Sequence, residues 1–180
     1  MRWFWIDRYT EFVCTQRATA IKMVSLSEDH LHEYIPGFPA MSVAFVVEGI
    51  AQTGGLLVGQ ASDWRSKVVL AKVAKAVFHD HPRPGDCLRY TAIVENLQRD
   101  GAIIRGTSHI EDRLQAEVEI VFAYLDEERF GDVDLFPPGE FAAMLRMLRV
   151  LEVGRHPDGE KLVLPEYLAA AERALAASPA

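Results

Sequence analysis

The chain has 180 residues, 49% of them hydrophobic, which is enough to bury one substantial core. Its 19 basic and 26 acidic residues give a net charge of −7. This charge excludes a general nucleic-acid or membrane-surface binder, because such proteins concentrate Lys and Arg on one face. Only Cys14 and Cys87 are present, which excludes a disulfide framework and a cysteine-rich zinc site and fits a reducing compartment.

Neither the beginning of the chain nor its longest apolar run predicts a membrane or secretory segment. The opening residues, MRWFWIDRYTEF, carry charges at positions 2, 7 and 8 and lack the apolar stretch of a secretory signal. The longest apolar run begins at Val43, is interrupted by Glu48 and Gln52, and is short for a membrane span. We therefore expect a cytoplasmic protein.

The first half of the chain predicts strands, a loop and one buried helix. Residues 9–26 are rich in β-branched and aromatic residues and read as one long or two short strands. Residues 27–42 are dense in turn-formers, and regular structure is not expected there. Residues 43–60 are apolar on nearly every side, with Ser42 as the N-cap, and predict a buried helix. Its four glycines imply close approach to surrounding backbone.

Four strand-like segments follow, at residues 68–79, 87–97, 102–111 and 114–125, with turn chemistry at each junction. In the last of them apolar residues at the even positions 114–124 alternate with polar residues at 113, 115, 117 and 119, which predicts one buried and one solvated face. Beyond a connector at 126–139, helices are expected at 140–151 and 165–177. We expect an α+β protein in which an antiparallel sheet wraps a buried central helix. Three roles stay open for the helical tail: to cover the sheet, to extend a dimer contact or to cap a pocket.

Between residues 43 and 52 of the predicted helix, the strongly polar side chains are Glu48 and Gln52. Their spacing of four residues places them on one face of the helix. A buried carboxylate needs a partner or a cavity, since burial alone disfavours its charge. Two interpretations stay open for Glu48: a general acid/base or orienting carboxylate, and a structural ion pair or dimer contact.

Histidines in the preceding loop and a group of basic residues are the other candidates. His30 and His32 precede the helix, and histidine is the usual proton-transfer group, although a loop histidine is often only a surface residue. No cysteine or further histidine lies near them in sequence, so we expect no metal. The basic residues are either a solvated face or an attraction for an acidic carrier protein or a cofactor phosphate; they are Arg65, Lys67, Lys72, Lys75 and Arg83.

The order of these pieces resembles the β-hydroxyacyl carrier-protein dehydratases of fatty-acid synthesis. That family's motif reads H-F-P-G-x-P-x-M-P-G, four apolar residues, then E-A-x-A-Q. Positions 34–43 read YIPGFPAMSV, and positions 48–52, after four further apolar residues, read EGIAQ. Shorter matches are I-D-R at 6–8, K-A-x-F at 75–78 and P-G-D at 84–86. The resemblance covers roughly residues 5–125.

The resemblance implies a hot-dog fold over residues 1–126, with a connector and helical extension at 127–180. It implies that two subunits pair their sheets, so that a loop histidine and a helix carboxylate from opposite subunits perform the two proton transfers of dehydration. Glu48 matches that carboxylate and Gln52 the helix glutamine, whereas Tyr34 stands at the histidine position. Phe38, Met41 and Val43 then take substrate-binding positions. The helix N-terminus would give a backbone N–H, here that of Val43, to the thioester carbonyl.

The sequence therefore predicts a cofactor-free lyase that dehydrates β-hydroxyacyl thioesters of acyl carrier protein or coenzyme A, as a homodimer or larger hot-dog oligomer. Because a phenol is a poor base at neutral pH, three outcomes stay open: a relocated His32–Glu48 pair, a Tyr34-assisted activity, and loss of dehydration. Lys67, Lys72, Lys75 and Arg83 are the candidate carrier-protein contacts. The alternatives are a hot-dog thioesterase and a non-catalytic acyl-binding subunit that pairs with an active homologue.

Overall fold

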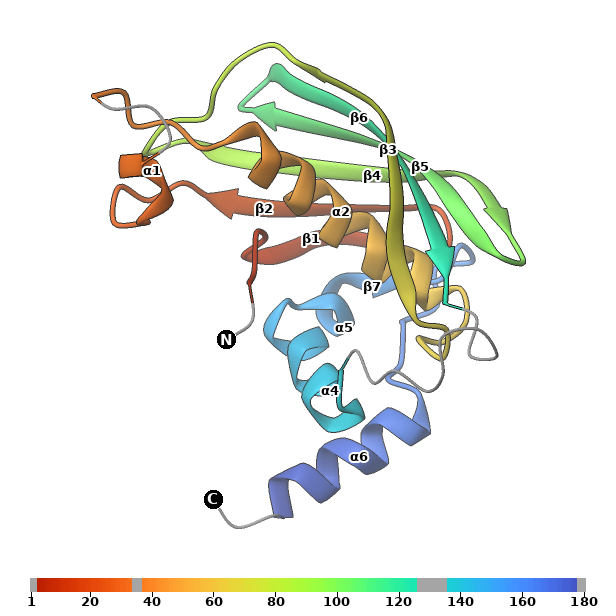
Figure 1. The fold of residues 1–180 in the computed structure, drawn as a ribbon. Coiled ribbons are helices and arrows are strands. Elements are labelled where there is room, and N and C mark those ends of the chain that lie inside the picture. Colours follow the sequence, from red (N-terminus) through yellow and green to blue (C-terminus); the bar gives the residue numbers. More distant parts are fainter. Residues whose placement is uncertain (1–2, 34–36, 126–135, 178–180) are drawn as a thin grey trace.

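A computed structural model describes residues 3–33, 37–125 and 136–177, and it contains one curled seven-stranded sheet around a central helix (Figure 1). The strand order is β3-β6-β5-β4-β2-β1-β7. All neighbouring strands are antiparallel except β1 and β7, which run parallel. The strands are β1 (Arg8–Val13), β2 (Arg17–Met23), β3 (Val68–Phe78), β4 (Cys87–Gln98), β5 (Gly101–Ile110), β6 (Arg113–Tyr124) and β7 (Gly154–Arg155).

The central helix α2 (Val43–Gln60) lies inside the curl of the sheet (Figure 1). The Ser42 hydroxyl accepts a hydrogen bond from the Ala44 N–H at 3.3 Å, as expected of an N-cap. By length and composition α2 is apolar enough to cross a membrane, but it is the core helix of the sheet, with Ile50 and Leu57 fully enclosed. A helix wrapped by an antiparallel sheet is the hot-dog arrangement, so the fold prediction is confirmed.

Two local predictions were wrong for identifiable reasons. Residues 27–42 were expected to lack regular structure, yet the chain makes one helical turn, α1 (His30–Glu33), before the central helix. On β6 the alternation fails at its start, where Leu114 is exposed and Gln115 is buried. A bulge shifts the β5–β6 register at this point, so the side-chain faces exchange. The Gln115 amide there donates to the Asp80 carbonyl at 2.7 Å.

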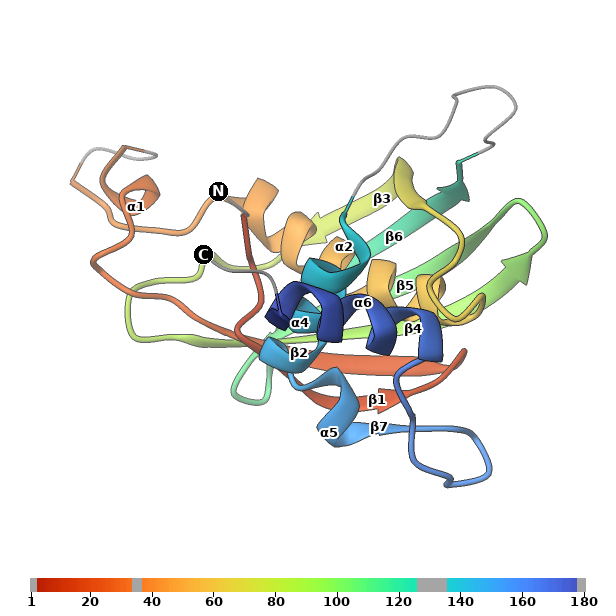
Figure 2. The same cartoon turned by 90° about the horizontal axis from the view of Figure 1, so that it is seen from below.

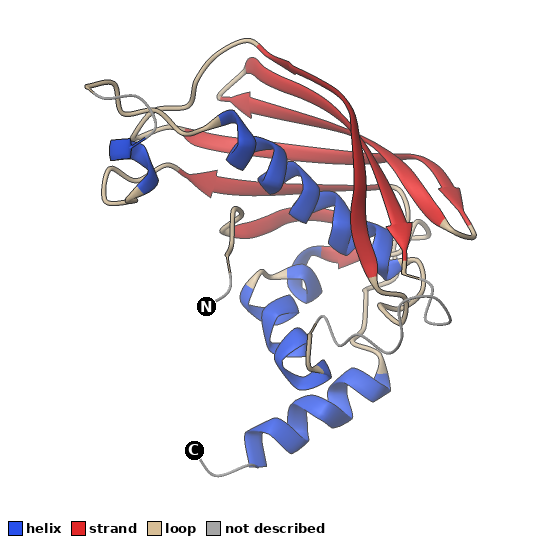
Figure 3. Cartoon of the chain, in the orientation of Figure 1, coloured by secondary structure: helices blue, strands red, loops and turns tan. Residues whose placement is uncertain are grey.

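The C-terminal tail adds α4 (Pro138–Met147), α5 (Val150–Val153), β7 and α6 (Glu166–Ala177). The expected single helix over 140–151 divides because Arg149 adopts a left-handed backbone conformation, with φ of 60°. The three helices lie on the same side of the sheet as α2 (Figures 2 and 3).

The tail is tied both to the sheet and to itself. The N–H of Tyr9 donates to the Leu148 carbonyl at 2.9 Å, and β7 pairs with the end of β1. Between the helices, the Arg146 guanidinium holds both carboxylate oxygens of Glu172, at 2.6 and 2.9 Å. The tail therefore extends the sheet by one short strand and forms a second layer beside α2.

Candidate functional site

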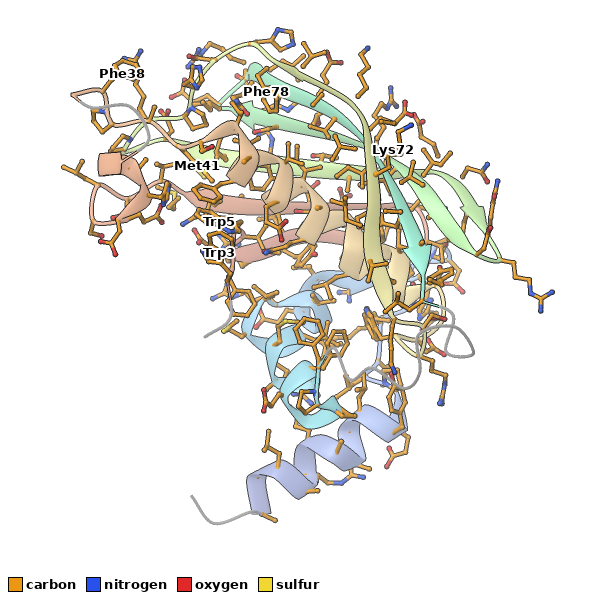
Figure 4. The ribbon with its side chains drawn as sticks, in the orientation of Figure 1. Trp3, Trp5, Phe38, Met41, Lys72 and Phe78 are labelled. Carbon is orange, nitrogen blue, oxygen red and sulfur yellow. The ribbon has the colours of Figure 1, made fainter. Side chains whose placement is uncertain are left out.

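A short N-terminal segment, Trp3–Trp5, crosses the flank of α2 and is held there by the side chain of Gln52. The Trp5 N–H donates to Gln52 Oε1 at 2.9 Å, and Gln52 Nε2 donates to the Trp3 carbonyl at 2.8 Å. The Tyr9 hydroxyl, from β1, donates to the Gln52 backbone carbonyl at 3.0 Å. The two bonds to Trp3 and Trp5 fix the orientation of the Gln52 side-chain amide, and Figure 4 shows Trp3 and Trp5 together beside this part of the helix.

The same amide orients Glu48. Gln52 Nε2 lies 3.0 Å from Glu48 Oε1, which confirms that the two side chains share one face of α2. Among the residues the structure describes, the second carboxylate oxygen, Oε2, has no hydrogen-bond partner. Glu48 is half-buried and forms part of a cavity wall, so the carboxylate is both positioned and accessible.

The cavity has a volume of about 670 Å³ and lies between α2, the N-terminal segment and the C-terminal tail. One wall is a stripe of α2 at intervals of three and four residues, made of Glu48, Ala51, Gln52, Gly55, Leu56 and Gly59. The opposite wall comes from the tail and includes Phe141, Met144, Leu148, Tyr167 and Leu168. A carboxylate and an amide therefore face a cavity that is otherwise largely apolar along the helix.

The remaining loop candidates either do not line this cavity or fall outside the described residues. His32 belongs to the helical turn α1, and Tyr34 falls outside the described residues. Phe38 is partly exposed beneath the Arg83 guanidinium, 4.6 Å from its ring centroid. Met41 is fully buried, and its N–H donates to the Pro82 carbonyl. Neither Phe38 nor Met41 lines the 670 Å³ cavity.

His30 is a second histidine candidate, and the structure places it near the Glu48 end of α2. Its ring centroid lies 5.0 Å from that of Trp5 and 4.8 Å from that of Phe45, one turn before Glu48. Burial lowers the pKa of His30, partly offset by Glu28, whose carboxylate lies 3.7 Å from the ring. Because the pKa is lowered, we expect a neutral His30 imidazole at pH 7. A smaller cavity of about 430 Å³ lies on this side of the N-terminal segment.

The basic residues do not form one cluster. Lys72 and Lys75 are exposed on β3, and Arg83 is exposed in the loop between β3 and β4 (Figure 4 labels Lys72). Arg65 and Lys67 instead line the 670 Å³ cavity, and the Arg65 guanidinium lies 4.6 Å from the ring centroid of Tyr167. Three of the four predicted carrier contacts therefore lie away from the cavity.

Sequence reasoning did not identify the N-terminal segment or the cavity wall supplied by the tail. The signals were present: three aromatic residues at positions 3–5, and the helical spacing of Phe141, Met144, Leu145 and Leu148. They could not be assigned to the site, because the hydrogen bonds from Gln52 to the segment span 47 and 49 residues. No group of three metal-ligating side chains occurs among the described residues.

Comparison with solved structures supports the fold. The dehydratase heterocomplex ApeI:P from Xenorhabdus doucetiae superposes with a TM-score of 0.58 at 12% identity, over 69% of this chain and 85% of that one. The smu.793 protein of Streptococcus mutans UA159, solved with acetyl CoA, gives 0.56 at 14% identity, over 69% and 93%. These identities are low, so the likeness concerns the hot-dog fold alone.

Sequence relatives are closer, although no family model matches the chain. The 3-hydroxyacyl-(acyl-carrier-protein) dehydratase FabZ of Thermomicrobium roseum is 32% identical over 124 residues, which cover 68% of this chain and 83% of the relative. That of Koribacter versatilis is 34% identical over 117 residues, 64% and 75% of the two chains. With this identity and coverage, the chain belongs to the 3-hydroxyacyl-(acyl-carrier-protein) dehydratase family.

Proposed function

We propose that this protein dehydrates 3-hydroxyacyl thioesters, carried by acyl carrier protein or coenzyme A, in fatty-acid or related acyl-chain biosynthesis. The observation that carries the proposal is the Glu48 carboxylate, which Gln52 holds at one oxygen and which lines a largely apolar cavity with the other oxygen free of a described partner. Family membership supplies the substrate class, since the relatives are named as dehydratases of such thioesters.

Dehydration moves two protons. One leaves the carbon next to the thioester carbonyl, and one reaches the departing hydroxyl, so that an enoyl thioester and water form. Glu48 performs one of these transfers, and a side chain of the loop before α2 on the opposite subunit, His32 or Tyr34, performs the other. The developing negative charge on the thioester oxygen is stabilised by the N–H of Val43, at the first position of α2. No acceptor for this N–H is found among the described residues.

The proposed assembly is a homodimer in which the β3 strands of two subunits pair. Support comes from β3 itself, which among the described strands pairs only with β6 and is exposed from Leu70 to Ala76. Lys72, Lys75 and Arg83 would then flank the interface and attract an acidic carrier protein. We further propose a cytoplasmic location, and a division into a hot-dog unit at 1–126 and an extension at 127–180.

The test follows enoyl absorbance when the purified protein is supplied with 3-hydroxybutanoyl pantetheine thioester. Glu48→Gln keeps the shape and the hydrogen bond to Gln52 but removes the acid/base, and should lower kcat by about 10²–10⁴-fold. Glu152→Gln changes an exposed carboxylate on α5 and serves as the matched control. His32→Ala and Tyr34→Phe, compared at equal stability, identify the second proton-transfer group.

An inactive wild-type homodimer, or a Glu48→Gln variant with undiminished turnover, overturns the proposal. Release of free thiol without enoyl formation would instead identify a hot-dog thioesterase. Thioester binding without turnover, restored to turnover by a second hot-dog chain that supplies a histidine, would identify a non-catalytic subunit. The residue that motivates this last outcome is Tyr34, which stands where the family motif has histidine.

A further inference from the structure

We propose that the C-terminal extension gives the Glu48 site an acyl pocket of defined length. In this pocket the acyl chain of a substrate of about twelve carbons lies along α2. This inference rests on the proposed function for the position of the thioester end. It adds the substrate length and the part of the chain that sets it. The extension lies outside the segment that matches the family motifs, so this wall belongs to this chain's own sequence.

The length follows from the α2 stripe. Glu48 and Gly59 both line the cavity and lie eleven residues apart, which corresponds to about 16 Å at about 1.5 Å per residue. A carbon–carbon bond of about 1.52 Å and an angle of about 111° give an all-trans chain about 1.25 Å per carbon. The stripe therefore accommodates about twelve to thirteen carbons in line.

The polarity of the α2 wall gives the direction. Glu48 and Gln52 are the polar residues that α2 contributes to the cavity, and both lie at its N-terminal end. Beyond them the helix offers Gly55, Leu56 and Gly59, so an apolar tail meets only small or aliphatic groups on the helix wall. Arg65, Ser66 and Lys67, which follow the C-terminal end of α2, also line the cavity. A thioester at Glu48 therefore directs its acyl chain toward the C-terminal end of α2.

The small residues leave room, and the extension closes the far side. A Cβ added at Gly55 would meet only the Phe122 ring, at 3.6 Å, so the groove beside it is open. The opposite wall is held rigidly: the Tyr167 hydroxyl donates to the Asp63 carbonyl at 2.9 Å, and the Arg146–Glu172 pair joins α4 to α6. At the far end the indole of Trp64 is fixed by its bond to the Leu56 carbonyl at 3.0 Å. The pocket is thus bounded by α2 on one side, by the C-terminal extension on the other and by Trp64 at its far end.

Gly55→Leu is the sharpest test, because Gly55 lies seven residues beyond Glu48, about 10 Å or eight carbons along the stripe. The added side chain should obstruct longer tails more than short ones, and the change from glycine favours the helix, so loss through misfolding is not expected. Pantetheine thioesters of 3-hydroxybutanoate and 3-hydroxydodecanoate are compared. The ratio of their kcat/KM values should fall about tenfold or more against the longer chain. Ala170→Leu, on the exposed side of α6, is the control and should leave the ratio unchanged.

The outcomes separate this inference from the proposed function. If the wild type dehydrates 3-hydroxybutanoyl thioester but Gly55→Leu leaves the ratio unchanged, the acyl tail lies elsewhere and the inference is overturned. If no chain length is dehydrated, the proposed function fails, and binding of unreactive butyl and dodecyl pantetheine thioethers decides. Tighter binding of the dodecyl thioether that Gly55→Leu abolishes supports the pocket, whereas equal binding of the two refutes it.

Discussion

Two glycines of α2, Gly49 and Gly55, should respond in opposite ways to the same substitution. A Cβ added at Gly49 would lie 2.7 Å from Cζ of Tyr90 and 2.9 Å from the Trp5 carbonyl oxygen, closer than real contacts allow. The Tyr90 ring is fully buried, and burial raises the pKa of its hydroxyl. A Cβ at Gly55 would make only an ordinary contact with Phe122, at 3.6 Å. Gly49→Ala should therefore destabilise the protein, and Gly55→Ala should stabilise it.

The magnitude follows from what the two substitutions share. Both replace glycine by alanine inside one helix, which favours the folded state by about 0.8–1.0 kcal/mol in each case. Only Gly49→Ala adds the cost of overpacking, about 1–3 kcal/mol. The shared helix contribution cancels in the comparison. The free energies of unfolding of the two variants should therefore differ by about 1–3 kcal/mol.

The assay is urea unfolding of the wild type and both variants at one protein concentration, since association would make stability concentration-dependent. In thermal unfolding of a domain of this size, the same difference corresponds to a separation in Tm of roughly 2–12 °C, at about 2–4 °C per kcal/mol. Equal stabilities, or a Gly49→Ala variant more stable than Gly55→Ala, would refute the close packing of α2 on Tyr90 and the N-terminal segment.

Three further predictions concern side chains around α2 and β1. Gln52→Ala removes two hydrogen bonds to the N-terminal segment and should lower the free energy of unfolding by about 2 kcal/mol, at about 1 kcal/mol per bond; unchanged tryptophan fluorescence and stability would contradict the tether. Burial raises the pKa of the Cys14 thiol to about 11, so only about one thiol in a thousand is ionised at pH 8. A thiol reagent should label half-buried Cys87 first and Cys14 only on unfolding, and equal rates would exclude this. The pKa of His30 is lowered in the folded state, so as pH falls the unfolded chain takes up a proton at this imidazole before the folded protein does. The wild type should therefore lose stability relative to His30→Gln as pH falls below about 6.5. A difference that stays constant from pH 7.5 to pH 5 would remove His30 as the cause.

The central elements were predictable because local and tertiary signals agree there. The apolar run after Ser42 gives a helix with the expected bounds, and the turn residues between 82 and 113 separate strands β3 to β6 within one or two residues of their predicted ends. The bulge that exposes Leu114 depends on the register of the neighbouring strand, which no local pattern carries. The two-residue strand β7 is too short for any periodicity and forms only because β1 offers an edge.

The candidate site was predictable to the extent that it lies on one helix. Spacing alone placed Glu48 and Gln52 together, and their hydrogen bond follows from it. The groups that orient and enclose them come from both ends of the chain. Trp3 and Trp5 reach Gln52 across nearly fifty residues, and Tyr167 reaches Asp63 across 104. Contacts of such separation follow from the assembled topology, so only the structure supplies them.

The short strand β7 has a consequence for how copies of this chain can associate. An open edge of a sheet offers unpaired N–H and C=O groups to any neighbouring strand. At one border the tail occupies the outer side of β1, where Tyr9 and Cys14 donate to Leu148 and Arg155. Among the described strands, β3 is then the border left available for its whole length. A sheet with one free edge can pair with another copy only through that edge. Two such copies would form a closed dimer, because their pairing uses the free edge of both and leaves none for growth into a fibre.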